Sequence, residues 1–167
     1  IKAFLDVPNC EIAYVCDVDD DRLASGDNTI VGKQKEEVKK VSDFRRILDD
    51  PDIDALSIAA PNFWHTPAAV LACQAGKHVY VEKPGSYDAY EAKRIVTVAD
   101  KTGMKVQMGT QRRSYSGMLE GIQKIREGVI GKPLYARCWY SNQRPSIGIG
   151  KMVEPPVSYT HLRAHET

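Results

Sequence analysis

Three short segments of this 167-residue chain carry side chains that could do chemistry, and each directly follows an apolar run. The segments are Asp17, Pro61–His65 and Glu82–Pro84. A carboxylate at the end of a strand can accept hydrogen bonds from the ribose of a bound dinucleotide. A lysine held at a sheet edge beside a cofactor can give or take a proton. These residue types therefore indicate proton transfer next to a bound nucleotide.

Each segment also has a plainer interpretation. Asp17 begins an acidic cluster and could be an ordinary surface acid instead of a ribose-binding one. Pro61–His65 could be a turn in which Trp64 provides packing, and Glu82 and Lys83 could form a solvated pair on a loop. A fourth segment, Gly109–Arg113, could line a cleft or form a polar surface.

The apolar runs that precede these segments indicate strands separated by helices. Short runs of this type suit strands buried on both faces. Alternation of strands and helices predicts an α/β fold with a doubly wound parallel sheet. Ligands bind at the carboxyl edge of such sheets, which would gather the candidate residues there. The expected strands span residues 11–17, 55–60, 79–81 and 106–108.

The intervening helices have recognisable ends. We expect Thr66 to cap a helix that ends at Gly76. Asp88 and Glu91 form a capping-box-like pair at the start of a helix that ends at Gly103. A third helix carries apolar residues at 118, 122 and 125 and ends at Gly128. The segment between residue 17 and the strand at residue 55 is polar and either helical or loop-like.

Composition excludes several kinds of partner and site. The chain is 43% hydrophobic and 27% charged, and 23 Lys+Arg against 22 Asp+Glu give a net charge of +1. The near-zero net charge argues against a nucleic-acid-binding protein, and the hydrophobic content argues against a disordered one. No apolar run is long enough to cross a membrane. The four cysteines lack a C-x-x-C spacing, so we expect neither a zinc site nor a disulfide framework. The sequence predicts a small-molecule ligand, with no metal, nucleic acid or membrane partner.

The two ends of the chain differ from its middle. Residues 1–7 suit the end of a helix stopped before Pro8, which implies a preceding segment. Residues 157–167 resemble a translated sequencing adaptor, so we interpret them as a non-native tail. His161 and His165, whose i,i+4 spacing could suggest a metal pair, are set aside for that reason. The compartment stays open between cytoplasm and bacterial periplasm.

The order of these segments resembles the Gfo/Idh/MocA family of nicotinamide-dependent oxidoreductases, over roughly residues 1–150. The resemblance rests on Val15–Asp17, Pro61–His65, Ala75–Val79 leading to Glu82–Pro84, and Gly109–Arg113. A glycine-rich phosphate-binding turn normally lies about twenty residues before the ribose-binding acid, which here falls before residue 1. We therefore expect a Rossmann fold whose first strand and glycine loop are missing.

The resemblance implies two domains and specific site residues. Residues 1–131 would form a partial NAD(P)-binding Rossmann domain. Residues 132–156 would begin a second α/β domain for substrate binding and oligomerisation, opened by a strand over 134–140. Lys83 would be the catalytic lysine near the reacting carbon, and Asp17 would contact the adenosine ribose and favour NAD over NADP. The cofactor-binding set would be completed by Pro61, Asn62, His65 and Glu82 in the cleft, with Gln111 and Arg112 towards the nicotinamide or the substrate.

The implied activity is hydride transfer between a sugar-like secondary alcohol and NAD, by a parent protein that forms homo-oligomers. We expect this 167-residue chain to be inactive by itself because most of the second domain is missing. One alternative is an NAD-dependent glycoside hydrolase of the same superfamily, although such branches often lack the lysine at the position of Lys83. Another is a dinucleotide-binding module without catalysis.

Overall fold

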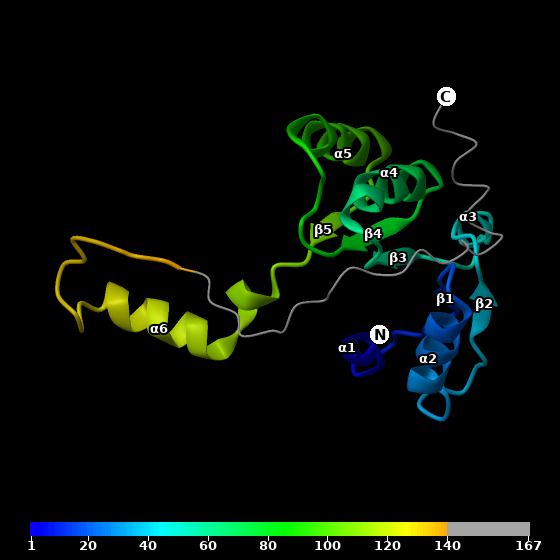
Figure 1. Cartoon of the computed structure of the whole chain (residues 1–167), viewed down its shortest axis with the longest axis horizontal. Helices are drawn as coiled ribbons and strands as arrows, with labels where there is room; N and C mark the ends of the chain where they lie inside the picture. The colour runs from blue at the N-terminus through cyan, green and yellow to red at the C-terminus, as the bar shows by residue number, and fades with distance from the viewer. Residues whose placement is uncertain (140–167) are drawn as a thin grey trace, which may run out of the picture. The chain divides into compact units, whose positions relative to one another are not determined.

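The computed structural model describes residues 1–139, in which helices and strands alternate along the chain (Figure 1). The chain divides into a compact unit over Ile1–Met108 and a second unit that begins at Gly109. The predicted α/β alternation is confirmed. The elements of the first unit are α1 (Lys2–Leu5), β1 (Tyr14–Cys16), α2 (Asp20–Ile30), β2 (Lys39–Val41), α3 (Arg45–Leu48), β3 (Ala55–Ile58), η1 (Asn62–Trp64), α4 (His65–Gln74), β4 (His78–Val81), α5 (Ala89–Thr102) and β5 (Val106–Met108).

The strands form two parallel sheets. One has the order β1-β2 and the other the order β3-β4-β5. Dinucleotide-binding sheets usually have the order 3-2-1-4-5-6. In that scheme β2 and β1 match positions three and two, whereas β3, β4 and β5 match positions four to six. Position one is filled by no strand within residues 1–139. The predicted doubly wound parallel arrangement is confirmed.

The register of the larger sheet brings its strands to an end at one edge. Ile58 at the end of β3 is paired with Val81 at the end of β4, and Val81 is paired with Met108 at the end of β5. The Glu82 amide extends this pairing by donating to the Ile58 carbonyl at 2.9 Å. The loops that follow β3 and β4 therefore start side by side.

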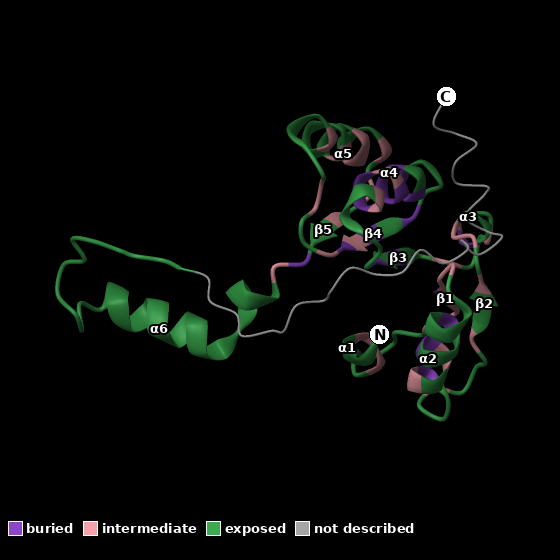
Figure 2. Cartoon of the chain, viewed as in Figure 1, coloured by how far each residue is buried: buried purple, intermediate pink, exposed green. Residues whose placement is uncertain are grey.

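A hydrophobic core lies between the larger sheet and its helices, as Figure 2 shows by the buried residues of α4 and β4. Burial alternates along β3, where Leu56 and Ile58 are buried and Ala55 and Ser57 are exposed. The expectation of strands buried on both faces is therefore wrong for β3, and it is also wrong for β5, where Gln107 and Met108 are exposed. Alternation is the pattern of a strand with only one face covered, and α4 is the helix that packs against β3 and β4.

The apolar pattern missed a short strand, whereas the polar segment before that strand is helical, one of the two alternatives stated for it. β2 is Lys39–Val41, whose residues 39 and 40 are exposed lysines. The polar segment before it contains α2, which Asp19 caps by accepting from the Asp21 amide at 2.9 Å and the Arg22 amide at 3.2 Å. Backbone pairing with β1, rather than side-chain apolarity, defines β2.

The ends of α4 and α5 partly match the predicted ends. Asp88 caps α5 by accepting from the Glu91 amide at 2.8 Å, which confirms that prediction. Gly76 and Gly103 adopt positive φ angles of 74° and 72° beyond the ends of α4 and α5. The predicted Thr66 cap is wrong, because α4 already begins at His65 and the Thr66 hydroxyl bonds elsewhere.

The second unit contains η2 (Gln111–Ser114) and α6 (Ser116–Arg126), the third predicted helix. The predicted strand over 134–140 is wrong across 134–139, where the chain has no regular structure. Leu134, Tyr135 and Trp139 are exposed, and a strand needs a neighbouring backbone to bond. Residues 140–156 of the predicted second domain and the predicted tail at 157–167 lie outside the described residues.

Candidate functional site

Asp17 lies directly after β1, where the resemblance expects a ribose-binding acid. Its amide donates to the Val41 carbonyl at 3.3 Å, so the backbone pairing of β1 and β2 continues to this residue. Its half-buried carboxylate accepts from the Asp19 amide at 3.0 Å through Oδ1. This turn orients the carboxylate at the end of the strand.

A second carboxylate lies just beyond the end of β2. Asp43 binds the Arg45 guanidinium, with Nη2–Oδ2 and Nε–Oδ1 distances of 2.6 and 2.9 Å. The hydrogen bonds from Arg45 hold the pKa of the Asp43 carboxyl below its usual range, so Asp43 stays ionised. Arg45 has its charge paired with Asp43, so it is not a free cation for a ligand at this end of the sheet.

The half-buried Cys16 thiol is affected by both acids. Its pKa is raised to about 11, first by burial and then by the negative charges of Asp43 and Asp17. Both carboxylates therefore act on the last residue of β1. A ligand bound at this edge would meet hydrogen-bond acceptors with negative charge, which suits hydroxyl groups and disfavours a phosphate.

The loop after β3 exposes its polar residues and packs its aromatic one. Pro61 and Asn62 are exposed. The Trp64 amide donates to the Pro61 carbonyl at 2.8 Å, and the Trp64 ring meets the Phe44 ring edge-on at a centroid distance of 6.3 Å. The interpretation of Trp64 as packing is thus compatible with a ligand-facing role for Asn62.

His65 and Thr66, the first residues of α4, are buried, each 2% exposed. His65 Nδ1 lies 2.5 Å from the Pro84 carbonyl oxygen, and Nε2 lies 2.8 Å from the Ala60 carbonyl oxygen. The Thr66 hydroxyl donates to the Gly85 carbonyl at 3.3 Å. These two side chains therefore contact the backbone of the loops that leave β3 and β4.

Glu82 and Lys83 begin the loop after β4. The Lys83 side chain is exposed, and the Lys83 amide contacts Glu82 Oε2 at 3.3 Å. The bond between Lys83 and Pro84 is cis. Together with Asn62 on the loop after β3 and His65 at the start of α4, these residues lie at the carboxyl edge of the larger sheet, as the sequence predicts.

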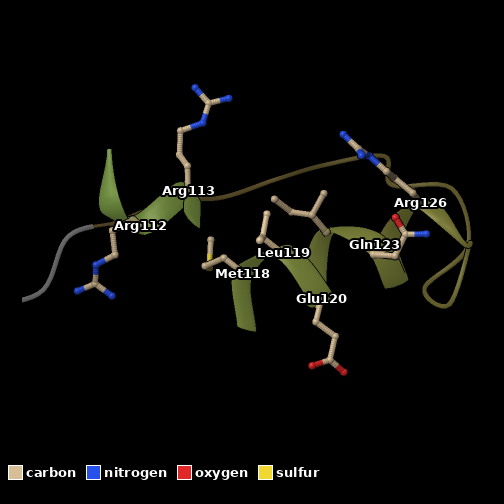
Figure 3. A pocket seen from close by; sticks show the side chains of 8 residues that line it. Arg112, Arg113, Met118, Leu119, Glu120, Gln123 and Arg126 are labelled. Carbon is tan, nitrogen blue, oxygen red and sulfur yellow. The ribbon is translucent and has the colours of Figure 1, made fainter. Parts of the chain in front are cut away.

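Gln111 and Arg112 belong to η2 of the second unit, so the structure does not join them with the residues of the first unit. Both are exposed. Arg112 and Arg113 border a surface hollow whose floor is formed by the apolar residues Met118, Leu119 and Ile122 of α6. Figure 3 shows the side chains of Arg112 and Arg113 directed to opposite sides of η2.

Two polar side chains with structural importance were missed. Lys77, 6% exposed, donates from Nζ to the Asp50 carbonyl at 2.7 Å and ties the start of β4 to the loop after α3. Thr66 was expected to bond its own helix rather than the loop after β4. The available signal was that Thr66 directly follows His65. Both residues belong to the first turn of the same helix, so their side chains could contact the same neighbouring loops.

Other kinds of site find no candidate in the described part of the chain. Within residues 1–139, no group of three or more His, Cys, Asp or Glu side chains could hold a metal ion. None of the helices found there has the length and apolarity needed to cross a bilayer.

A protein-family model described as an oxidoreductase family with an NAD-binding Rossmann fold matches residues 1–110. The inositol 2-dehydrogenase of Salmonella paratyphi B is 32% identical over 129 residues, which cover 77% of this chain and 37% of that protein. A glycosyl hydrolase family 109 protein of Saccharopolyspora erythraea is 32% identical over 141 residues, which cover 81% of this chain and 30% of that protein. The chain thus spans a little over a third, or less, of the length of these relatives.

Solved structures with the same fold include one complex with NADH and one with NADP. The WlbA dehydrogenase of Bordetella pertussis, in complex with NADH and UDP-GlcNAcA, has a TM-score of 0.66 and 26% identity over 77% of this chain and 36% of its own. A 3-ketoreductase of Actinomadura kijaniata, in complex with NADP and TDP-benzene, has a TM-score of 0.68 and 23% identity over 77% of this chain and 38% of its own. At that identity the second structure supports the fold alone.

Proposed function

Because this chain belongs to the Gfo/Idh/MocA family of oxidoreductases with an NAD-binding Rossmann fold, we propose that it is part of a nicotinamide-dependent dehydrogenase of a sugar-like secondary alcohol. The observation that carries the proposal is the placement of Glu82 and Lys83 beside Asn62 on neighbouring loops at the carboxyl edge of the sheet. Open α/β sheets bind their ligands at that edge. The parent protein would act as a homo-oligomer.

The acids after β1 and β2 fit the adenosine half of the cofactor. Asp17 would accept hydrogen bonds from the ribose hydroxyls, since its carboxylate is fixed at the strand end by the Asp19 amide. Asp43 adds a second negative charge near Cys16, and its partner Arg45 is already bound. A 2′-phosphate would meet repulsion from both carboxylates, so NAD is the preferred cofactor.

The loops after β3 and β4 fit the reactive half. Pro61, Asn62 and Glu82 would line the cleft, and Gln111 and Arg112 would approach the nicotinamide or the substrate. The sequence also places His65 in the cleft, but its ring is buried and faces two backbone carbonyls, so it would support the cleft rather than line it. The nicotinamide ring, when bound, supplies the hydride acceptor. Lys83 would take the proton from the substrate hydroxyl at Nζ during oxidation and return it during reduction. The Lys83 side chain is exposed, so a substrate can reach Nζ. The neutral amine would take the proton in the oxidation, and the ammonium so formed would return it in the reduction.

A glycoside hydrolase is the second candidate, favoured by the glycosyl hydrolase family 109 relative. The two activities share NAD and a sugar-like substrate. Lys83 favours the dehydrogenase, because it provides the proton carrier that net oxidation of an alcohol needs. The remaining alternative is a dinucleotide-binding module without catalysis. In such a module the acids after β1 and β2 would still bind the cofactor, but Lys83 would have no catalytic role.

The test uses the full-length protein that contains this chain, supplied with NAD or NADP and a panel of inositols, sugars and glycosides. We expect substrate-dependent NADH formation that Lys83→Ala lowers at least about a hundredfold. Lys101→Ala, which removes an exposed lysine on α5, is the matched control and should leave the rate unchanged. Asp17→Asn should narrow the preference for NAD over NADP about tenfold.

Other outcomes would identify the alternatives. Sugar release without net NADH would support the hydrolase, and NAD binding without either reaction would support the binding module. A Lys83→Ala variant with the parental rate would contradict the dehydrogenase mechanism.

A further inference from the structure

The polar side chains at the start of α4 bond to neighbouring loops instead of to their own helix. A threonine at the N-cap position of a helix commonly accepts a hydrogen bond from a free amide of its own helix. Here Trp64 occupies the cap position and makes no capping bond with its side chain. The buried Thr66 hydroxyl donates instead to Gly85, nineteen residues further along the chain. Its hydrogen bond therefore serves the loop after β4.

His65 makes the same kind of contact to two loops at once. Its Nδ1 faces the Pro84 carbonyl and its Nε2 faces the Ala60 carbonyl. Either neutral tautomer can donate to one of these oxygens, and the doubly protonated ring can donate to both. Because the ring is buried between them, it sets the spacing between the loop that follows β3 and the loop that follows β4.

Lys83 lies between two fixed points of the backbone. On one side, the Glu82 amide is bonded to Ile58 of β3. On the other side, the carbonyls of Pro84 and Gly85 are bonded to His65 and Thr66. The Lys83 side chain is exposed, so packing does not fix its position. Its backbone is located by the strand before it and by α4 after it.

We propose that His65 and Thr66 are positioning residues for Lys83, acting on the Pro84–Gly85 backbone rather than on a ligand directly. This inference rests on the catalytic role of Lys83 in the proposed function. A buried side chain that sets the spacing of two loops controls the distance between a reactive amine and whatever the other loop binds. Misplacement of a catalytic group by about 1 Å can cost roughly a hundredfold in rate. Removal of these bonds should therefore lower kcat more than it weakens cofactor binding.

The kinetic test compares four variants of the full-length protein. Thr66→Val keeps the shape of the side chain and removes its hydroxyl, whereas Thr66→Ser keeps the hydroxyl. We expect Thr66→Val to lower kcat about threefold and Thr66→Ser to restore most of that loss, since the bond is long at 3.3 Å. His65→Gln, which keeps an N–H donor, should lower kcat by about tenfold or more, with less than about a threefold change in KM for NAD. The fourth variant is Lys83→Ala.

A double-mutant cycle separates positioning from general stability. If His65 acts through Lys83, then His65→Gln should cause no further loss of kcat in the Lys83→Ala background. An equal loss in both backgrounds would overturn the proposal, as would a Thr66→Ser variant no better than Thr66→Val. A Lys83→Ala variant with full activity would instead refute the proposed function.

A measurement without turnover keeps the proposal testable when the substrate is unknown. Amide hydrogen exchange of the 167-residue chain should accelerate several-fold over residues 83–87 in Thr66→Val, while β4 at 78–81 keeps its protection. Thr97→Val, which removes an exposed hydroxyl bonded within α5, is the matched control and should leave both segments unchanged. Unchanged exchange at 83–87 in Thr66→Val would show that the hydroxyl does not hold the loop.

Discussion

The two ends of the candidate site are built by different physical means. At the loops after β3 and β4, buried polar side chains of α4 hold the backbone, and the residues proposed to meet ligands remain exposed. At the ends of β1 and β2, partly exposed charged side chains bond to one another and to nearby amides. The first arrangement fixes geometry, because its bonds are shielded from water. The second fixes the sign of the local charge, because solvent weakens each bond without removing the charges.

The largest expected effect is the loss of stability when the buried contacts are removed. His65→Leu removes the buried ring that faces the Ala60 and Pro84 carbonyls, so at least one hydrogen bond is lost, which should cost about 2 kcal/mol in the free energy of unfolding. Asp43→Asn, at the other end, should cost less than about 1 kcal/mol, since the Arg45 pair is screened by solvent. Urea unfolding of the two variants measures both values. Equal losses would remove the physical distinction between the two ends.

The sequence predicted the strand ends well and the supporting contacts poorly. Asp17, Asn62 and Lys83 could be placed because an apolar run followed by a polar residue is a local signal for the end of a buried strand. β2 could not be placed in this way, since its exposed lysines give no apolar signal and its place in the sheet comes from backbone pairing with β1.

The role of Thr66 was equally hidden. Its local sequence satisfies the rules for a helix cap, and only the tertiary contact with Gly85, nineteen residues away, competes with that role. The predicted strand over 134–140 failed for a related reason, because β-favouring residues form a strand only beside a bonding neighbour, and 134–139 have none in the described structure. Contacts between distant segments, rather than residue propensity, decided both cases.

A smaller effect tests how closely α2 supports the end of β1. Gly26 lies in α2 where an added Cβ would be 2.7 Å from Cγ1 of Val15, the middle residue of β1. Gly26→Ala should therefore destabilise the chain by about 1–2 kcal/mol, although alanine favours helices. Gly121→Ala in α6 is the control, because nothing lies within 4 Å of its added Cβ, and it should be neutral or stabilising. Thermal unfolding of both variants measures the difference.

The Gly26 result also bears on the comparison of the two ends. A destabilised Gly26→Ala variant would mean that packing behind β1 is tight even though the charged groups at its end are not buried. A neutral Gly26→Ala variant would mean that α2 adjusts freely, and the end of β1 would then depend mainly on its hydrogen bonds.

The smallest expected effect measures the charge at the end of β1 directly. The pKa of the Cys16 thiol is raised to about 11, and the Asp43 charge is the second cause after burial. A carboxylate disfavours a nearby thiolate, so Asp43→Asn should lower the Cys16 pKa, by about half a unit for a partly screened charge. The measurement is the pH at which alkylation of Cys16 reaches half its maximal rate, followed peptide by peptide by mass spectrometry.

The direction of this shift separates charge from burial. Asp43 stays ionised throughout the pH range of the titration, because Arg45 keeps its own pKa low. Asp43→Glu keeps the charge and serves as the matched control, with a midpoint close to that of the parent. If Asp43→Asn also kept the parental midpoint, burial and the Asp17 charge would account for the raised Cys16 pKa without Asp43. The acidic character that we propose to disfavour a 2′-phosphate would then depend on Asp17 without help from Asp43.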